Sequence, residues 1–60
     1  MNDKMIRVVM FRRWDEHYGA WRTDTTEILS SSWDDAVRTL MKNFSRARNP
    51  RLIRFKKVGV

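Results

Sequence analysis

Apolar residues between positions 32 and 47 recur at intervals of three and four, the spacing that places side chains on one stripe of an α-helix. Ser32 can cap the first turn, because its hydroxyl accepts a backbone N–H that has no partner within the helix. Asn49-Pro50 is expected to end the element, since proline disfavours a helical conformation in the residue before it. The pattern predicts one helix over residues 32–47, with Trp33 covering the core. The apolar stripe comprises Trp33, Ala36, Val37, Leu40, Met41, Phe44 and Ala47.

Three other segments have the composition of β-strands. Residues 4–14 are rich in β-branched and aromatic side chains, and both of their alternating faces are apolar, which suits a central strand. Residues 20–29 are threonine-rich and more polar, as an edge strand is. Residues 51–58 form the third strand, in which Ile53 and Phe55 can face the helix and Leu52 faces away. Residues 15–19 form a hairpin turn, where Gly19 can adopt a positive φ.

The order of the elements is strand, strand, helix, strand. A right-handed crossover through the helix makes the third strand parallel to the second. If the first strand lies between them, every neighbouring pair is antiparallel. We therefore predict an α+β fold of β-β-α-β order over residues 1–60, a single small domain. Its three-stranded antiparallel sheet has the order 2-1-3, with the helix packed on one face and the other face open.

Charge is concentrated at the end of the chain. The net charge is +6, and residues 1–45 contain equal numbers of cations and anions. A neutral body with a basic C-terminal quarter favours an acidic partner, either a protein surface or nucleic acid. The alternative is an ordinary solvated edge strand. All six net charges come from Arg46, Arg48, Arg51, Arg54, Lys56 and Lys57.

Strand alternation limits how many of these cations can act together. Neighbouring strand residues point to opposite faces, so Arg54 and Lys56 are predicted on the open face with Leu52, and Arg51 and Lys57 on the opposite one. Four phosphate contacts at most are then usable, which supports only weak, sequence-independent nucleic-acid binding. Those four cations are Arg46, Arg48, Arg54 and Lys56.

Aromatic residues flank the predicted hairpin turn. Trp14, Tyr18 and Trp21 belong to residue types that are enriched in binding hot spots. In the alternative interpretation, Trp14 and Trp21 pair across the strands and stabilise the hairpin. The predicted partner-binding residues combine both groups: Trp14, Tyr18, Trp21, Arg46, Arg48, Arg51, Arg54 and Lys56.

Catalytic chemistry is not indicated. The chain has no cysteine, and its one histidine, His17, lies in the predicted turn, so no metal site is expected. No glycine-rich phosphate loop or nucleophile motif is present, and we expect neither an enzyme nor a cofactor. No apolar run is long enough to span a membrane, and no signal peptide is evident, which predicts a cytoplasmic protein.

Two short segments resemble the small Dmd-type antitoxins of T-even phages: residues 5–11 (MIRVVMF) and residues 39–44 (TLMKNF). The length of the chain and the order of its elements are also similar to that family. That family binds and neutralises bacterial RNA-cleaving toxins of the RnlA/LsoA type. The resemblance implies a non-enzymatic inhibitor that acts on a host protein in the bacterial cytoplasm. The segment before the helix is shorter here and the C-terminus more basic than in that family, so no toxin-contacting residue is transferred.

The helix start is also similar to that of the small RNA polymerase inhibitor of T-odd phages. In that protein a Ser/Thr-x-Asp-Asp/Glu-Ala cap leads into a short helix and a basic last strand, and Ser32, Asp34, Asp35 and Ala36 fit the pattern. The resemblance implies host RNA polymerase as the alternative target. A small basic nucleic-acid-binding module is the third hypothesis.

Overall fold

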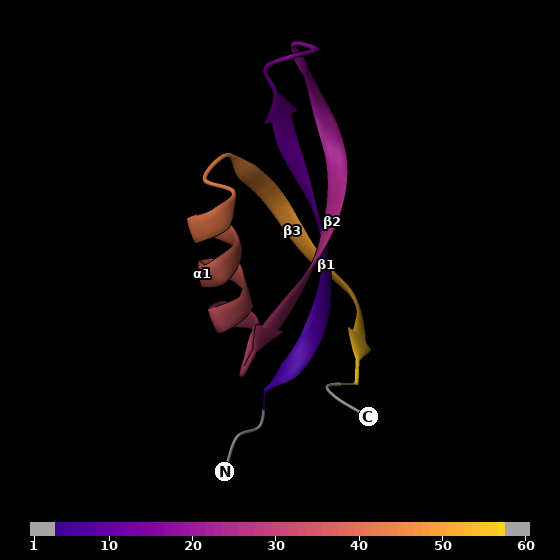
Figure 1. Cartoon of the computed structure of the whole chain (residues 1–60), viewed down its shortest axis with the longest axis vertical. Helices are drawn as coiled ribbons and strands as arrows, with labels where there is room; N and C mark the ends of the chain where they lie inside the picture. Colours follow the sequence, from indigo (N-terminus) through magenta and orange to yellow (C-terminus); the bar gives the residue numbers. More distant parts are fainter. Residues whose placement is uncertain (1–3, 58–60) are drawn as a thin grey trace.

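The computed structural model describes residues 4–57, which form three strands and one helix in the predicted order. The sheet order is β2-β1-β3, and both neighbouring pairs are antiparallel. Helix α1 lies along one face of the sheet (Figure 1). The predicted α+β fold, its strand order and the central position of the first strand are therefore confirmed. The elements are β1 (Met5–Asp15), β2 (Ala20–Ser30), α1 (Trp33–Asn43) and β3 (Ala47–Lys56).

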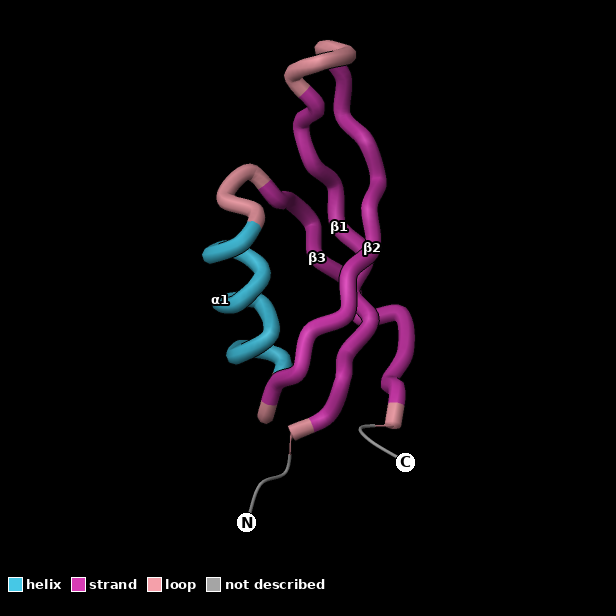
Figure 2. Tube along the Cα trace, viewed as in Figure 1, coloured by secondary structure: helices cyan, strands magenta, loops and turns pink. Residues whose placement is uncertain are grey.

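Strands β1 and β2 form a long ribbon that is paired without interruption from Met5↔Ser30 to Asp15↔Ala20. The turn closes as predicted: Gly19 has φ +63°, and its N–H donates to the Asp15 carbonyl at 2.8 Å. The Asp15 carboxylate accepts the N–H of His17 at 2.9 Å. The turn end of the ribbon extends past the helix (Figure 2), so the molecule is elongated, 43 × 19 × 15 Å.

Helix α1 begins as predicted and ends earlier than predicted. The Asp35 N–H donates to the Ser32 hydroxyl at 3.1 Å, which confirms the N-cap. The helix ends at Asn43 with Phe44 as its C-cap, so the prediction that it continues to Ala47 is wrong. Ala47 is buried in β3 instead, opposite Arg13, and its N–H donates to the Phe44 carbonyl at 2.9 Å. Ala47, the last residue of the apolar stripe, is thus buried as part of a strand and not of the helix.

Strand β3 contains the residues that were expected to separate it from the helix. Asn49 and Pro50 lie inside β3, so the predicted strand start at Arg51 is wrong, and the predicted last residue, Val58, lies outside the described residues. Pro50 is tolerated because β3 is an edge strand and its pairing with β1 is irregular at this point. Asn49 has φ 54°, a left-handed conformation that asparagine adopts more readily than most residues.

The core lies between α1 and the adjacent face of the sheet. Trp33 and Phe44 pack against its buried members, which confirms the predicted position of Trp33. The rings of Phe11 and Phe44 are 5.0 Å apart. Buried Ser30 is satisfied by Arg7, which donates to its carbonyl at 2.8 Å and to its hydroxyl at 3.0 Å. The buried core cluster comprises Val9, Phe11, Ile28, Ala36, Leu40 and Ala47.

Candidate binding surface on the open face of the sheet

The sheet face opposite α1, the open face, is formed by the alternate residues of each strand. Val9 and Phe11 belong to the core that α1 covers, so their side chains lie on the helix side of the sheet. The residues that alternate with them along β1 therefore lie on the open face. Residues that are directly paired in an antiparallel sheet share a face, so the strand register gives the members from β2 and β3. From β1 the open face receives Ile6, Val8, Met10, Arg12 and Trp14; from β2 Trp21, Thr23, Thr25, Glu27 and Leu29; and from β3 Arg48, Arg51, Arg54 and Lys56.

Two irregularities in the β1–β3 pairing bring the β3 cations onto one face. They lie between Val8 and Val9 and between Met10 and Arg12. An extra residue on one strand of a pair interrupts the simple alternation of faces. Cations that are three residues apart on β3 therefore lie opposite residues that are two apart on β1. The pairs are Arg48↔Arg12, Arg51↔Met10, Arg54↔Val8 and Lys56↔Ile6.

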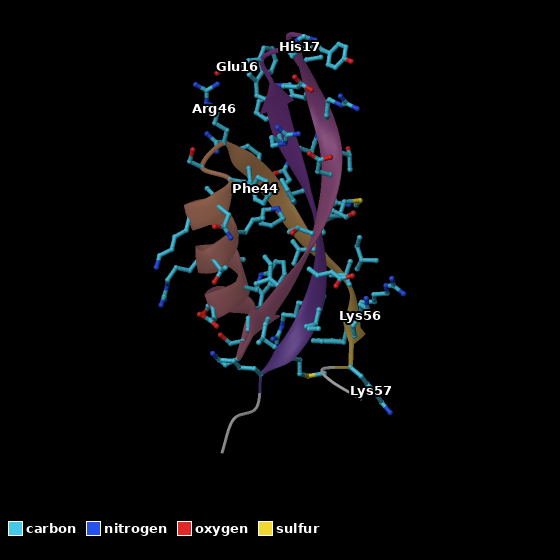
Figure 3. The ribbon with its side chains drawn as sticks, in the orientation of Figure 1. Glu16, His17, Phe44, Arg46, Lys56 and Lys57 are labelled. Carbon is cyan, nitrogen blue, oxygen red and sulfur yellow. The ribbon has the colours of Figure 1, made fainter. Side chains whose placement is uncertain are left out.

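This register corrects part of the sequence prediction. Arg51 was expected on the face opposite Arg54, but it is paired with Met10 and lies on the open face. Leu52 was expected on the open face, but it is paired with Val9 on the helix side. The placement of Arg54 and Lys56 on the open face is confirmed by the same register, and Lys56 points away from α1 in Figure 3. We call Arg48, Arg51, Arg54 and Lys56 the cationic row.

Most cations of the open face lack an internal counter-charge. Among residues 4–57, no carboxylate lies within salt-bridge distance of the four exposed arginines Arg12, Arg48, Arg51 and Arg54. Lys56 is the exception: its ammonium is 2.9 Å from the Glu27 carboxylate, a pair that bridges β3 and β2 across β1. Unpaired arginines on one face create a positive potential that attracts anions.

Trp14 on β1 and Trp21 on β2 form an aromatic platform on the same face as the cationic row. The rings of Trp14 and Trp21 pack edge to face at 5.6 Å, which confirms the alternative interpretation that they pair across the strands. The Arg12 guanidinium lies 5.9 Å from the centre of the Trp21 ring, which stays 45% exposed. A hollow of about 270 Å³ is lined by Arg12, Trp21, Arg48 and Asn49. A second, of about 280 Å³, shares Arg12 and Asn49 and is also lined by Met10, Phe11, Thr23 and Arg51.

Arg12 was not among the predicted site residues. The available signal was its spacing: it is two residues from both Met10 and Trp14, so it belongs to the same face of β1. The other residues of that face that precede Trp14 are apolar, and a single arginine among them is not a binding signal in the sequence alone. Arg12, Trp21 and the cationic row together form what we call the basic face.

Tyr18 and Arg46 lie away from the basic face. Tyr18, 68% exposed, occupies the turn between β1 and β2, where the Arg22 guanidinium lies 5.2 Å from its ring centre. Arg46 lies in the loop between α1 and β3 and forms an ion pair with Glu16 near the ribbon turn (Figure 3). The structure therefore separates Arg46 from the cations with which it was grouped, and leaves Tyr18 in a second exposed region.

The ribbon turn also contains Asp15, a carboxyl group whose pKa is lowered by the fold. Desolvation raises the pKa of Asp15, but hydrogen bonds from Arg22, Tyr18 and His17 outweigh it, so the pKa lies below the ordinary value of 3.8. The Asp15 carboxylate is 3.1 Å from the Arg22 guanidinium. Through these contacts Asp15 stabilises the turn.

Within residues 4–57, no group of three or more His, Cys, Asp or Glu side chains could hold a metal ion. The single helix of this part of the chain is too short to cross a membrane. Comparisons with protein families, with curated proteins and with solved structures found no match to the chain. The resemblance to the Dmd-type antitoxins therefore stays a prediction.

Proposed function

We propose that this protein acts by binding, without catalysis, and that it binds nucleic acid through the basic face. The observation that carries the proposal is the convergence of Arg12, Arg48, Arg51 and Arg54 on one side of the sheet with no carboxylate partner among residues 4–57. Arginine and lysine contacts to phosphates supply most of the affinity of sequence-independent nucleic-acid binding. The observed register of β3 places more cations on the open face than the strict alternation of side chains predicted from the sequence.

The test is the salt dependence of binding. Four phosphate contacts predict that the logarithm of the association constant falls with the logarithm of salt concentration with a slope of about −3 for a single strand. Affinity should then decrease about 50-fold between 50 and 200 mM salt. Fluorescence anisotropy of a labelled oligonucleotide measures both quantities. Binding that is tight and insensitive to salt would contradict the proposal.

Single substitutions test whether the salt dependence of binding arises from the basic face. Arg54→Ala should reduce the slope by about 0.7, because it removes one phosphate contact. Arg38→Ala is the matched control, since Arg38 is an exposed arginine on α1, which lies on the other face of the sheet. Equal effects of the two substitutions would mean that net charge, rather than this surface, determines binding.

A second candidate is inhibition of a bacterial host protein, a toxin nuclease of the RnlA/LsoA type or RNA polymerase, in the bacterial cytoplasm. The observation that favours it is the exposed end of the β1–β2 ribbon, which extends past the helix (Figure 1) and carries the exposed ring of Tyr18 at its turn and the Trp14–Trp21 pair next to the turn. Tyrosine and tryptophan often dominate binding energy at protein interfaces. A nuclease surface that binds RNA is itself basic, so the cationic row is poorly suited to that surface.

Affinity purification from bacterial lysate, with mass spectrometry of bound proteins, tests this second candidate. A specific partner should be retained in near-stoichiometric amount by the wild type and by Arg38→Ala. It should be lost with Tyr18→Ala, because that substitution removes the most exposed aromatic ring of the ribbon end. Recovery of the same proteins with all three would identify non-specific retention and count against this candidate.

A further inference from the structure

We infer that the basic face binds single-stranded nucleic acid in preference to a duplex, with phosphates along the cationic row and a base stacked on Trp21. The inference rests on the proposed function and names the form of nucleic acid that the surface accepts. Three features carry it: the spacing of the row, the distance from the row to the aromatic platform, and the exposure of the Trp21 ring.

The cationic row has a regular spacing that is set by β1. Its members are opposite every second residue of β1, from Arg12 to Ile6. Two strand residues rise by about 7 Å, so successive cations are separated by roughly that distance along the sheet. This interval is of the same order as the separation of successive phosphates along an extended nucleic-acid backbone. The row therefore has the length to follow about four phosphates in sequence.

The platform lies across the sheet from the row. Arg48 on β3 pairs with Arg12 on β1, which pairs with Thr23 on β2, two residues from Trp21. Crossing from β3 to β2 covers two strand spacings, or about 10 Å. A backbone that runs along β3 could therefore extend a base across β1 toward Trp21. The hollow lined by Arg12, Trp21, Arg48 and Asn49 lies on this path.

The aromatic platform is the feature that favours single strands over duplexes. A base can stack on an aromatic side chain only after it has left its own stack and its pairing partner. Trp21 is 45% exposed, and contacts with Trp14 and Arg12 hold its ring in place. Surfaces that combine a cationic path with such a ring bind single strands with little sequence preference. A duplex would contact the row alone.

A second copy of the chain is a poor occupant of the same surface. Pairing two β3 edges, or stacking two open faces, would bring the unpaired arginines of both copies together, and like charges oppose such contact. The surface is complementary to a flexible polyanion instead. Single-stranded DNA and single-stranded RNA share this chemistry, and both are used in the test.

The experiment measures the affinity for three labelled nucleic acids by fluorescence anisotropy at one salt concentration. They are a single-stranded DNA of eight nucleotides, a single-stranded RNA of the same sequence, and the duplex of that DNA with its complement. Both single strands should bind at least tenfold more tightly than the duplex. An unlabelled oligo-glutamate peptide is added as a competitor to represent an acidic protein, and should displace the strand only weakly. Displacement by the peptide at a concentration similar to that of unlabelled DNA would overturn the inference in favour of an acidic protein partner.

Variants at Trp21 test the stacking itself. Trp21→Ala should weaken binding of single strands about 5- to 150-fold and leave duplex binding unchanged. Trp21→Phe retains an aromatic ring and should recover most of the affinity. It is also the folding control, because it can still pack against Trp14, and circular dichroism compares both variants with the wild type.

The two proposals fail in different ways. Equal binding of single strand and duplex, or equal affinity of the alanine and phenylalanine variants, would overturn the inference while salt-dependent nucleic-acid binding stands. Absence of measurable binding to all three nucleic acids would contradict the proposed function as well.

Discussion

The same substitution at two phenylalanines on the helix side of the sheet tests where the core ends. Phe11 on β1 is 1% exposed and packs against Phe44, whereas Phe55 on β3 is 48% exposed. Phe55 is paired with Arg7, whose guanidinium lies 5.2 Å from the centre of its ring. Both substitutions remove the same side chain from a strand, although β1 is central and β3 is an edge strand. Because β-propensity differences span only about 1 kcal/mol, a larger difference between the variants reports burial.

The magnitudes differ enough to be measured. Replacing a buried phenylalanine with alanine costs about 3–5 kcal/mol, because transfer free energy is lost and a cavity remains. At Phe55 the cost is about 1–2 kcal/mol, from partial burial and the contact with Arg7. A domain of 60 residues has a total unfolding free energy of about 3–9 kcal/mol. Phe11→Ala should therefore remove most of the stability, while Phe55→Ala leaves the protein folded.

Urea denaturation followed by far-ultraviolet circular dichroism measures both free energies of unfolding. If Phe11→Ala is already unfolded in water, Phe11→Leu provides the measurable variant, because it conserves most of the apolar volume and costs about 1 kcal/mol. Equal denaturation midpoints for Phe11→Ala and Phe55→Ala would refute the reasoning. That result would mean that the exposed Phe55 contributes as much to the core as the buried Phe11.

Three further substitutions test local features. Ser32→Ala should lower the free energy of unfolding by about 1 kcal/mol, because it removes the hydroxyl that accepts the Asp35 N–H. Ser32→Asp should restore the lost stability, and urea denaturation measures both variants. Gly19→Ala should cost about 1 kcal/mol through its left-handed backbone alone, since no atom lies within 4 Å of the added methyl group, and Gly19→Asn should cost less in the same assay. The lowered pKa of Asp15 stabilises the fold above pH 3.8, and this contribution is lost as the pH falls through the folded-state value. Asp15→Asn should therefore reduce the urea midpoint at neutral pH, and the difference from the wild type should shrink in acid; a constant difference would contradict the assignment.

The amino-acid sequence by itself determined the elements that depend on local chemistry. Ser32 caps α1, Gly19 closes the ribbon turn, and the two apolar faces of residues 4–14 identify the central strand. Each result depends on a few neighbouring side chains or on a simple repeat. The strand order followed from the handedness of the crossover and from the burial of the first strand. The pairing of Trp14 with Trp21 followed from the hairpin.

Tertiary structure alone decided where α1 ends and which way the β3 side chains point. Ala47 fits the helical stripe, but it is buried as the first residue of β3, opposite Arg13. Arg51 and Arg54 lie on one face because the pairing of β3 with β1 is irregular, and an irregularity depends on how two strands distant in sequence fit together. Composition showed that the last quarter of the chain is basic. Only the register showed that Arg12 and the β3 cations share one surface, because register arises from contacts between strands.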